Sequence, residues 1–191
     1  STTDQKQVSS LIKDFESLYP GIKVEYHDMN STEIYNRFIS ESAVGASADV
    51  VWSSAMDHAI KLVNDGYAQP HKLSDASKLP DWAIWKNEAF GTTFEPIAIV
   101  YNKRLVDPSE VPKTHAEFTK LLSSKQAKFQ GKVTTYDPEK SGVGFMLHSQ
   151  DAMASSAGFW DLAKAMGQAG MRVQTSVGTM LERIVSGENL I

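Results

Sequence analysis

Helical and strand-like patterns alternate along the first 66 residues of the chain, and this alternation restricts the fold more than any other feature. Apolar residues at helical spacing predict helices over residues 5–19, 29–42 and 55–66. Between these helices, residues 22–28 alternate apolar and polar side chains, and residues 49–54 form a short, nearly all-apolar run. Both patterns are typical of strands. Parallel strands need crossover connections, usually helices, so this order predicts a doubly wound α/β sheet.

The second half of the chain repeats the alternation after a less regular segment at 67–95. The elements predicted there are strands at 96–102, 131–137 and 172–176 and helices at 114–122, from Phe145 onward, at 156–169 and at 177–187. We therefore predict two doubly wound α/β lobes, residues 1–95 and 96–191, joined by extended strand segments. The first helix has no strand before it, and residues 188–191 look like the start of a strand. We expect both lobes to be incomplete.

Composition limits the class of partner. The chain has 191 residues, and no run of it approaches the ~18 apolar residues that a membrane-spanning helix needs. It has no cysteine, which excludes disulfides and thiolate chemistry. The formal net charge of −4 is uneven: 1–95 carry 8 Lys and Arg against 14 Asp and Glu, whereas 96–191 carry 11 against 9. Because no basic stripe is present, we expect no nucleic-acid partner.

The common enzyme motifs are missing. The sequence lacks G-x-S-x-G, H-E-x-x-H and G-x-x-x-x-G-K-[ST], and Gly142 and Gly144 are followed by Leu147, which breaks the dinucleotide-binding pattern. The histidines include no i,i+4 pair, and a lone histidine such as His27 or His58 is more often a surface or core residue than a ligand. We expect no catalytic residue, no cofactor and no metal site.

Polar residues recur where a predicted strand gives way to a helix. Four such junctions are 1–4, 53–54, 141–143 and 175–176. Ligands of open α/β sheets bind outside the carboxyl ends of the strands, where helix N-termini present N–H groups to anions. Each junction alone is also explained by simple helix capping. Four junctions over two lobes favour a shared ligand cleft, with Tyr136 beside one of them as a possible stacking residue.

Five stretches of the sequence resemble the extracellular solute-binding proteins of bacterial ABC importers. They are FESLYPGIKVEYHDMNSTEIYNRFISE (15–41), ADVVWSSAMDHAIKLVNDGYAQP (48–70), FEPIAIVYNKRLV (94–106), GKVTTYDPEKSGVGF (131–145) and MLERIVSGE (180–188). The most similar branch includes ferric-iron-, phosphoglycerate- and sugar-phosphate-binding members.

The resemblance implies a type II periplasmic binding-protein fold, in which two lobes close on a ligand and 94–102 form the first hinge crossing. It implies a strand before Ser1, and more than a hundred residues after Ile191 that complete both lobes. It also implies delivery to a membrane permease, from the periplasm or from a lipid-anchored position outside a Gram-positive cell. The ligand-binding residues that it implies are Thr2, Thr3, Asp4, Ser53, Ser54, Tyr136, Asp137, Ser141, Gly142, Val143, Thr175 and Ser176.

The resemblance leaves the ligand open. Ferric-binding relatives use a tyrosine pair outside this region, often with an N-terminal histidine or acidic ligand, and the junction at 1–4 has no histidine. Hydroxyls and backbone amides suit phosphate or carboxylate oxygens, so an anionic or phosphorylated organic solute is the favoured ligand. Ferric iron, uncharged sugars and polyamines are alternatives. So are a ligand-sensing domain and an enzyme on the same scaffold, with Asp4, Asp57 and Asp137 as its candidate acids.

Overall fold

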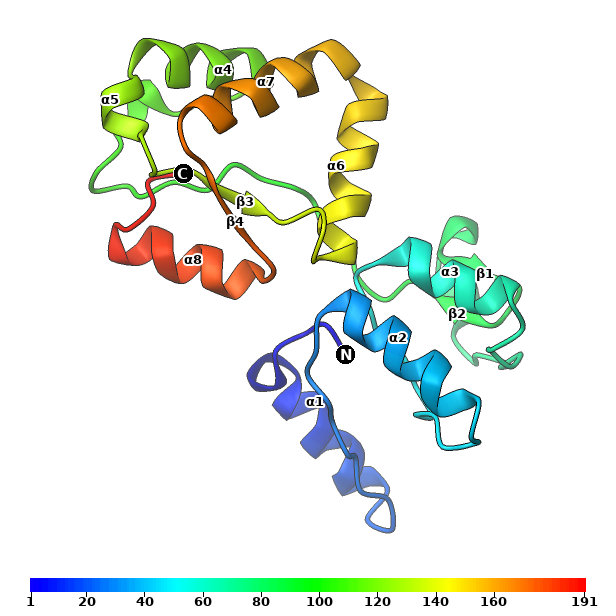
Figure 1. Ribbon diagram of the computed structural model, residues 1–191. Helices are drawn as coiled ribbons and strands as arrows, with labels where there is room; N and C mark the ends of the chain where they lie inside the picture. The colour runs from blue at the N-terminus through cyan, green and yellow to red at the C-terminus, as the bar shows by residue number, and fades with distance from the viewer. The chain divides into compact units, whose positions relative to one another are not determined.

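The computed structural model describes residues 1–191, and the chain divides into two compact units, Ser1–Phe94 (unit 1) and Glu95–Ile191 (unit 2) (Figure 1). Unit 1 is mainly helical. Its elements are α1 (Gln5–Leu18), α2 (Ser31–Ser42), α3 (Met56–Asn64), the short 3₁₀ helices η1 (Ala76–Lys78) and η2 (Asp81–Ala83), and the strands β1 (Ile84–Trp85) and β2 (Ala89–Phe90).

The helices of unit 1 begin and end where their sequence signals predict. Asn30 caps α2 by accepting the Glu33 N–H at 2.9 Å, and the Glu33 carboxylate accepts the Asn30 N–H at 3.1 Å. After α3, Gly66 has a φ of +81°, the left-handed conformation that commonly follows a helix. The packing differs from prediction, because the expected inward face of α1 buries only Val8, and Leu11 is 60% exposed.

The strands predicted at 22–28 and 49–54 are wrong, because both segments are irregular. Ser1 and Thr2 supply the main-chain pairing that joins them. The Ser1 nitrogen donates to the His27 carbonyl at 2.7 Å, and the Thr2 N–H donates to the Trp52 carbonyl at 3.1 Å. Pairing confined to these two residues does not make a ladder, so neither segment becomes a strand.

A short antiparallel hairpin lies in the segment that we expected to be irregular. β1 and β2 pair Ile84 with Phe90 and Trp85 with Ala89. The two residues of its turn, Lys86 and Asn87, have φ values of 52° and 55°. Positive φ at both central positions is the geometry of a type I′ turn. Sequence patterns missed the hairpin because this turn lacks the usual glycine.

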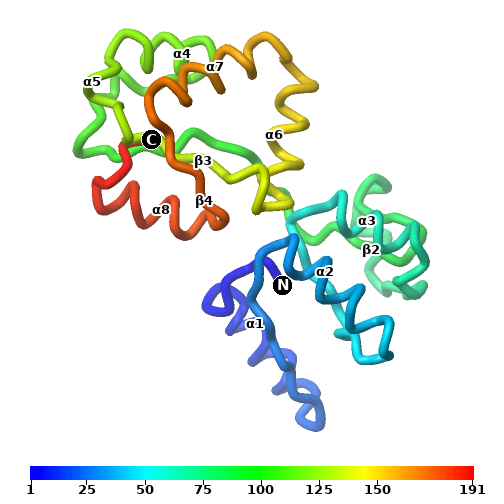
Figure 2. Tube along the Cα trace, in the orientation of Figure 1, coloured from blue at the N-terminus to red at the C-terminus, as the bar shows by residue number.

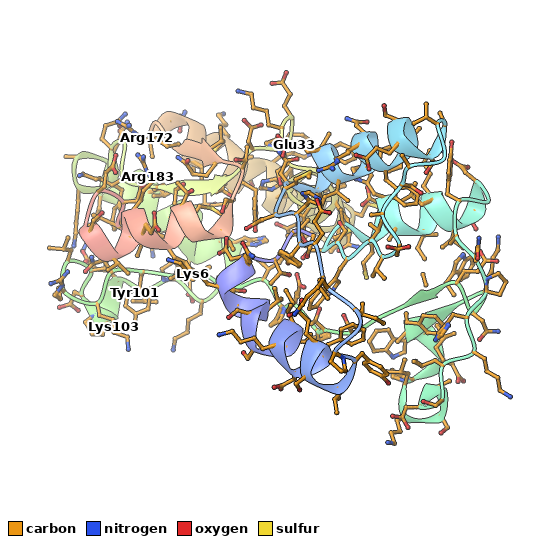
Figure 3. All side chains as sticks on the ribbon, turned by 90° about the horizontal axis from the view of Figure 1, so that it is seen from below. Lys6, Glu33, Tyr101, Lys103, Arg172 and Arg183 are labelled. Atoms are coloured by element: carbon orange, nitrogen blue, oxygen red, sulfur yellow. The ribbon has the colours of Figure 1, made fainter.

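Unit 2 has a parallel two-stranded sheet with helices on both faces. Its elements are η3 (Pro108–Glu110), α4 (His115–Ser124), α5 (Gln126–Phe129), β3 (Thr134–Tyr136), α6 (Gly142–Ala154), α7 (Ser156–Gln168), β4 (Arg172–Gln174) and α8 (Val177–Ser186). β3 pairs with β4 in the register Thr134 to Arg172 and Tyr136 to Gln174. Helices α4 and α7 pack together on one side of this sheet and α8 covers the other (Figures 2 and 3).

The last residues of the chain lie beside β3, where the sequence predicts the start of a strand. Leu190 donates its N–H to the Lys132 carbonyl at 2.7 Å, and Ile191 accepts the Thr134 N–H at 2.9 Å. On the other side, the Asn102 N–H donates to the Leu190 carbonyl at 2.9 Å. The strand predicted over 96–102 is otherwise wrong. These residues are irregular, and Ile97 is 67% exposed. The segment pairs with residue 190 through Asn102, and a single pairing residue does not make a strand.

The main hydrophobic core belongs entirely to unit 2. Residues from α4, α5, α7 and the segments beside the sheet form one buried cluster: Val106, Phe118, Leu121, Leu122, Phe129, Val133, Leu162, Ala165, Met166, Ala169, Leu190 and Ile191. Phe129 and Val133 are fully buried. This core holds the strand ends, and therefore the polar junctions that follow them, in a fixed framework.

Candidate functional site

Two of the predicted polar junctions meet within unit 1. The Thr2 hydroxyl accepts the Ser54 N–H at 3.0 Å, and the hydroxyl oxygens of Thr2 and Ser54 are 3.3 Å apart. The Ser53 hydroxyl accepts the Ala55 N–H at 3.1 Å, just before α3 begins. Residues about fifty positions apart in the sequence thus form one cluster of hydroxyls at the start of α3.

Thr3 and Asp4, which also belong to the first junction, have different surroundings. Thr3 accepts a hydrogen bond at its carbonyl from the Tyr26 hydroxyl, at 2.5 Å, and its N–H donates to the Ser1 hydroxyl at 3.2 Å. Asp4 is exposed and precedes α1 without a side-chain cap hydrogen bond. Sequence patterns placed Tyr26 on the apolar face of a strand and missed its role in holding this junction.

The junctions of unit 2 lie at one edge of its sheet. The Asp137 N–H donates to the Gln174 carbonyl at 2.8 Å, immediately after the paired residues Tyr136 and Gln174. Thr175 and Ser176, which follow β4, therefore lie beside the turn that follows β3. Both are exposed. The residues that follow β3 and the residues that follow β4 thus lie together at the carboxyl ends of the two parallel strands, as expected for an open α/β sheet.

Asp137 builds the turn between β3 and α6. It is 8% exposed, and its Oδ1 accepts the N–H groups of Glu139 at 2.9 Å and Lys140 at 3.2 Å. Its carbonyl accepts the Ser141 N–H at 3.0 Å. A carboxylate that accepts the amides two and three residues later fixes the local backbone, so its first role is structural.

Ser141 caps α6 and is fully buried. Its hydroxyl accepts the Gly144 N–H at 3.2 Å, and its exposed fraction is 1%. Ser141 stays a predicted ligand-binding residue, because a hydroxyl that accepts the Gly144 N–H still has its own hydrogen to donate. Ser176 caps α8 in a similar way, accepting the Gly178 N–H at 3.2 Å. Gly142 and Val143 form the first turn of α6, where a helix directs its N–H groups outward.

Tyr136 is half-buried at the end of β3. Burial raises the pKa of its phenol, and the negative charge of Glu95 raises this pKa further. The phenol therefore stays neutral at physiological pH and can donate a hydrogen bond. His148, one of the residues that sequence reasoning missed, holds the same strand end: its Nε2 lies 3.2 Å from the Tyr136 carbonyl oxygen.

The candidate histidines and acids outside these junctions have local partners. The His27 Nε2 lies 3.0 Å from a Glu25 oxygen, and the ring of His58 packs on Tyr35 with centroids 4.7 Å apart. The His58 Nε2 is 4.0 Å from the Asp57 carboxylate. The structure gathers no group of three or more His, Asp or Glu side chains suited to a metal ion.

Comparison with known proteins decides the family. Residues 1–179 match the profile of the family described as "Bacterial extracellular solute-binding protein". The chain belongs to this family. Its members bind solutes and are not enzymes, which confirms the expectation of a binding protein. No curated protein matches the chain.

A solved structure is similar over nearly the whole chain. It is the crystal structure of the substrate binding protein of the ABC transporter from Agrobacterium tumefaciens, with 39% sequence identity and a TM-score of 0.94. The match covers 99% of this chain and 56% of that one. The chain therefore has a mixed α/β structure that corresponds to part of a periplasmic binding-protein fold. None of its helices combines the length and apolar character that crossing a bilayer requires.

Proposed function

We propose that the whole protein captures a small solute between two lobes and delivers it to the permease of an ABC importer. The main support is that polar junctions distant in sequence come together in each unit. Thr2 meets Ser54 in unit 1, and Asp137 meets Gln174 in unit 2. Two such clusters, one in each unit, are what a ligand held between lobes requires.

The ligand that we propose is an anionic or phosphorylated organic compound. In unit 1, the hydroxyls of Thr2 and Ser54 suit oxyanion oxygens. In unit 2, α6 begins at Gly142, and the positive end of its helix dipole favours an anion there. Asp137 Oδ1 accepts two amide N–H groups, so this oxygen is committed to holding the turn. This chemistry favours an oxyanion over bare ferric iron.

Glu95 favours an organic ligand over a bare oxyanion. Its charge acts on the Tyr136 phenol, so a carboxylate lies near the proposed anion site. The negative charge of Glu95 repels a bare oxyanion placed beside it, because like charges repel. A sugar phosphate or a phosphoglycerate carries hydroxyls that can donate to Glu95 while its phosphate meets the helix start. The proposed solute therefore has an anionic end and a hydroxyl-bearing end.

Thermal unfolding with candidate ligands tests this proposal. The protein is melted with inorganic phosphate, 3-phosphoglycerate, glucose 6-phosphate and ferric citrate. A ligand present at 100 times its dissociation constant stabilises the folded state by about 2.7 kcal/mol. We expect a shift with an organophosphate. A large shift with ferric citrate and none with any organophosphate would overturn the proposed ligand class.

Matched variants identify where the ligand binds. Thr2→Val removes one hydroxyl of the cluster and keeps a side chain of similar size. It should weaken organophosphate binding at least tenfold. Ser123→Ala removes a hydroxyl on α4 that donates to the Thr119 carbonyl, far along the chain from every junction, and should leave binding unchanged. Equal losses from both variants would contradict the proposed site.

A further inference from the structure

We infer that Gly144 is the residue that sets how closely α6 approaches the end of β3, and thereby positions the groups that contact the ligand. This inference rests on the proposed function, because it concerns the same junction.

The space around Gly144 has no room for a side chain. A Cβ atom at this position would lie 2.7 Å from the Tyr136 Cβ, 3.2 Å from the Asp137 carbonyl oxygen and 3.2 Å from the Ser141 Cβ. Carbon atoms at 2.7 Å overlap strongly, and a Cβ cannot rotate away because it is fixed to its main chain. Either α6 or the end of β3 would have to move. All three neighbours are predicted ligand-binding residues.

Two polar contacts lie at this close approach. The Gly144 N–H donates to the Ser141 hydroxyl at 3.2 Å, and the His148 Nε2 lies 3.2 Å from the Tyr136 carbonyl. Gly144 and His148 are four residues apart and so lie on the same face of α6. That face rests on the last residue of β3. Displacing α6 from β3 would stretch the contact between His148 and the Tyr136 carbonyl and shift the first-turn amides of α6 away from Tyr136.

Two other glycines within a helix of unit 2, Gly158 and Gly167, lack this constraint. A Cβ at Gly167 in α7 would meet nothing within 4 Å. A Cβ at Gly158, also in α7, would meet the Ser155 hydroxyl at 2.9 Å, which is the end of a side chain that can rotate. Alanine is the better helix former, so Gly167→Ala should raise the melting temperature. Gly144→Ala should lower it. Gly167 is thus a matched control for the same chemical change.

Hydrogen exchange and ligand binding test the inference together. In Gly144→Ala we expect the amides of Glu139, Lys140, Ser141 and the residue at 144 to exchange at least tenfold faster. The amide of Glu117, which is capped by Thr114 on α4 with an N···O distance of 3.1 Å, should be unchanged. The dissociation constant for the organophosphate that stabilises the unmodified protein should rise at least tenfold. Gly167→Ala should change neither quantity.

The outcomes separate this inference from the proposed function. Unchanged exchange at the junction would overturn the role of Gly144, as would faster exchange throughout unit 2, which indicates general destabilisation. If the unmodified protein binds none of the four probes, the proposed function fails, and the exchange pattern still decides whether Gly144 sets the approach of α6. If Gly144→Ala fails to fold, the double variant with Tyr136→Gly removes the clashing Cβ. Recovery of folded protein supports the inference, and no recovery contradicts it.

Discussion

The two units are nearly equal in length and similar in sequence pattern, yet only unit 2 builds a sheet with a common core. In unit 2, β3 lies between β4 and residues 190–191, and one buried cluster packs against them. In unit 1, the corresponding segments 22–28 and 49–54 are irregular, and Val50 is 80% exposed. The difference shows that an apolar, strand-like pattern becomes a strand only where another segment supplies a ladder partner.

The two units also differ in how their polar junctions are held together. Unit 1 gathers Thr2 and Ser54 through local hydrogen bonds, although the strands predicted at 22–28 and 49–54 are absent. Unit 2 gathers Asp137 and Gln174 through the ends of a true parallel pair. We expect the junction of unit 2 to be rigid and the junction of unit 1 to open more readily, because few buried contacts support it.

The largest test of this comparison removes one apolar side chain from each unit. Phe129→Ala empties a fully buried position in unit 2 and should cost about 3–5 kcal/mol of unfolding free energy. Leu11→Ala, on the predicted inward face of α1, removes a side chain that is 60% exposed and should change stability by no more than about 0.5 kcal/mol. Urea unfolding measures both. Similar losses from the two variants would mean that Leu11 is buried and that the contrast between the units is false.

A second test uses the pH dependence of a charged cluster. Hydrogen bonds from Lys125 and Lys128, and from the Asp107 N–H, lower the pKa of Glu110 from 4.5 to about 2. A carboxyl group with a lowered folded-state pKa stabilises the protein above its unfolded pKa, and the contribution is lost as the pH falls from about 4.5 to 2. The melting temperature of unit 2 should therefore decline over this range.

Replacing the carboxylate identifies its share of that decline. Glu110→Gln should flatten the melting temperature between pH 5 and 3, with its main loss of stability at the higher pH. In unit 1, the Val24 N–H and Lys23 lower the pKa of Glu16, but the Lys23 side chain is 79% exposed. Glu16→Gln should flatten the curve less, because solvent screens this pair. A stronger effect at Glu16 would reverse the expected contrast.

Much of the fold can be predicted from local sequence, and the predictions that were wrong share a cause. The bounds of α2, α7 and α8, and the helix ends at Gly66 and Gly170, are predicted to within about two residues, since caps and glycines act on their neighbours. Pairing between distant segments is not written in either segment alone. That is why 131–137 and 172–176 were correctly predicted to contain strands, whereas the similar patterns at 22–28, 49–54 and 96–102 were not realised.

The candidate site is predictable to the same extent. The polar residues that follow the strand-like segments can be read from the sequence, and the structure brings Thr2 to Ser54 and Asp137 to Gln174. Their individual roles could not be predicted. The burial of Ser141 and the steric demand at Gly144 depend on how closely α6 packs on β3, which is a property of the tertiary structure. The sequence signal that could have identified Gly144 is a second glycine one turn into a helix.

The smallest test asks whether helix ends behave alike in both units. Asn30 caps α2 in unit 1 by accepting the Glu33 N–H, and Thr114 caps α4 in unit 2 by accepting the Glu117 N–H. The Glu33 carboxylate also accepts the Asn30 N–H, whereas Glu117 instead accepts the Lys113 N–H. Asn30→Ala and Thr114→Ala should each lower the free energy of unfolding by about 1 kcal/mol. A cap pairs a main-chain N–H of its own helix, and this contribution does not depend on what packs against the rest of the helix. Hydrogen exchange of Glu33 and Glu117 reports each cap directly. If the loss at Asn30 is negligible while the loss at Thr114 is full, α2 is already frayed, and the contrast between the units extends from tertiary packing to the helices themselves.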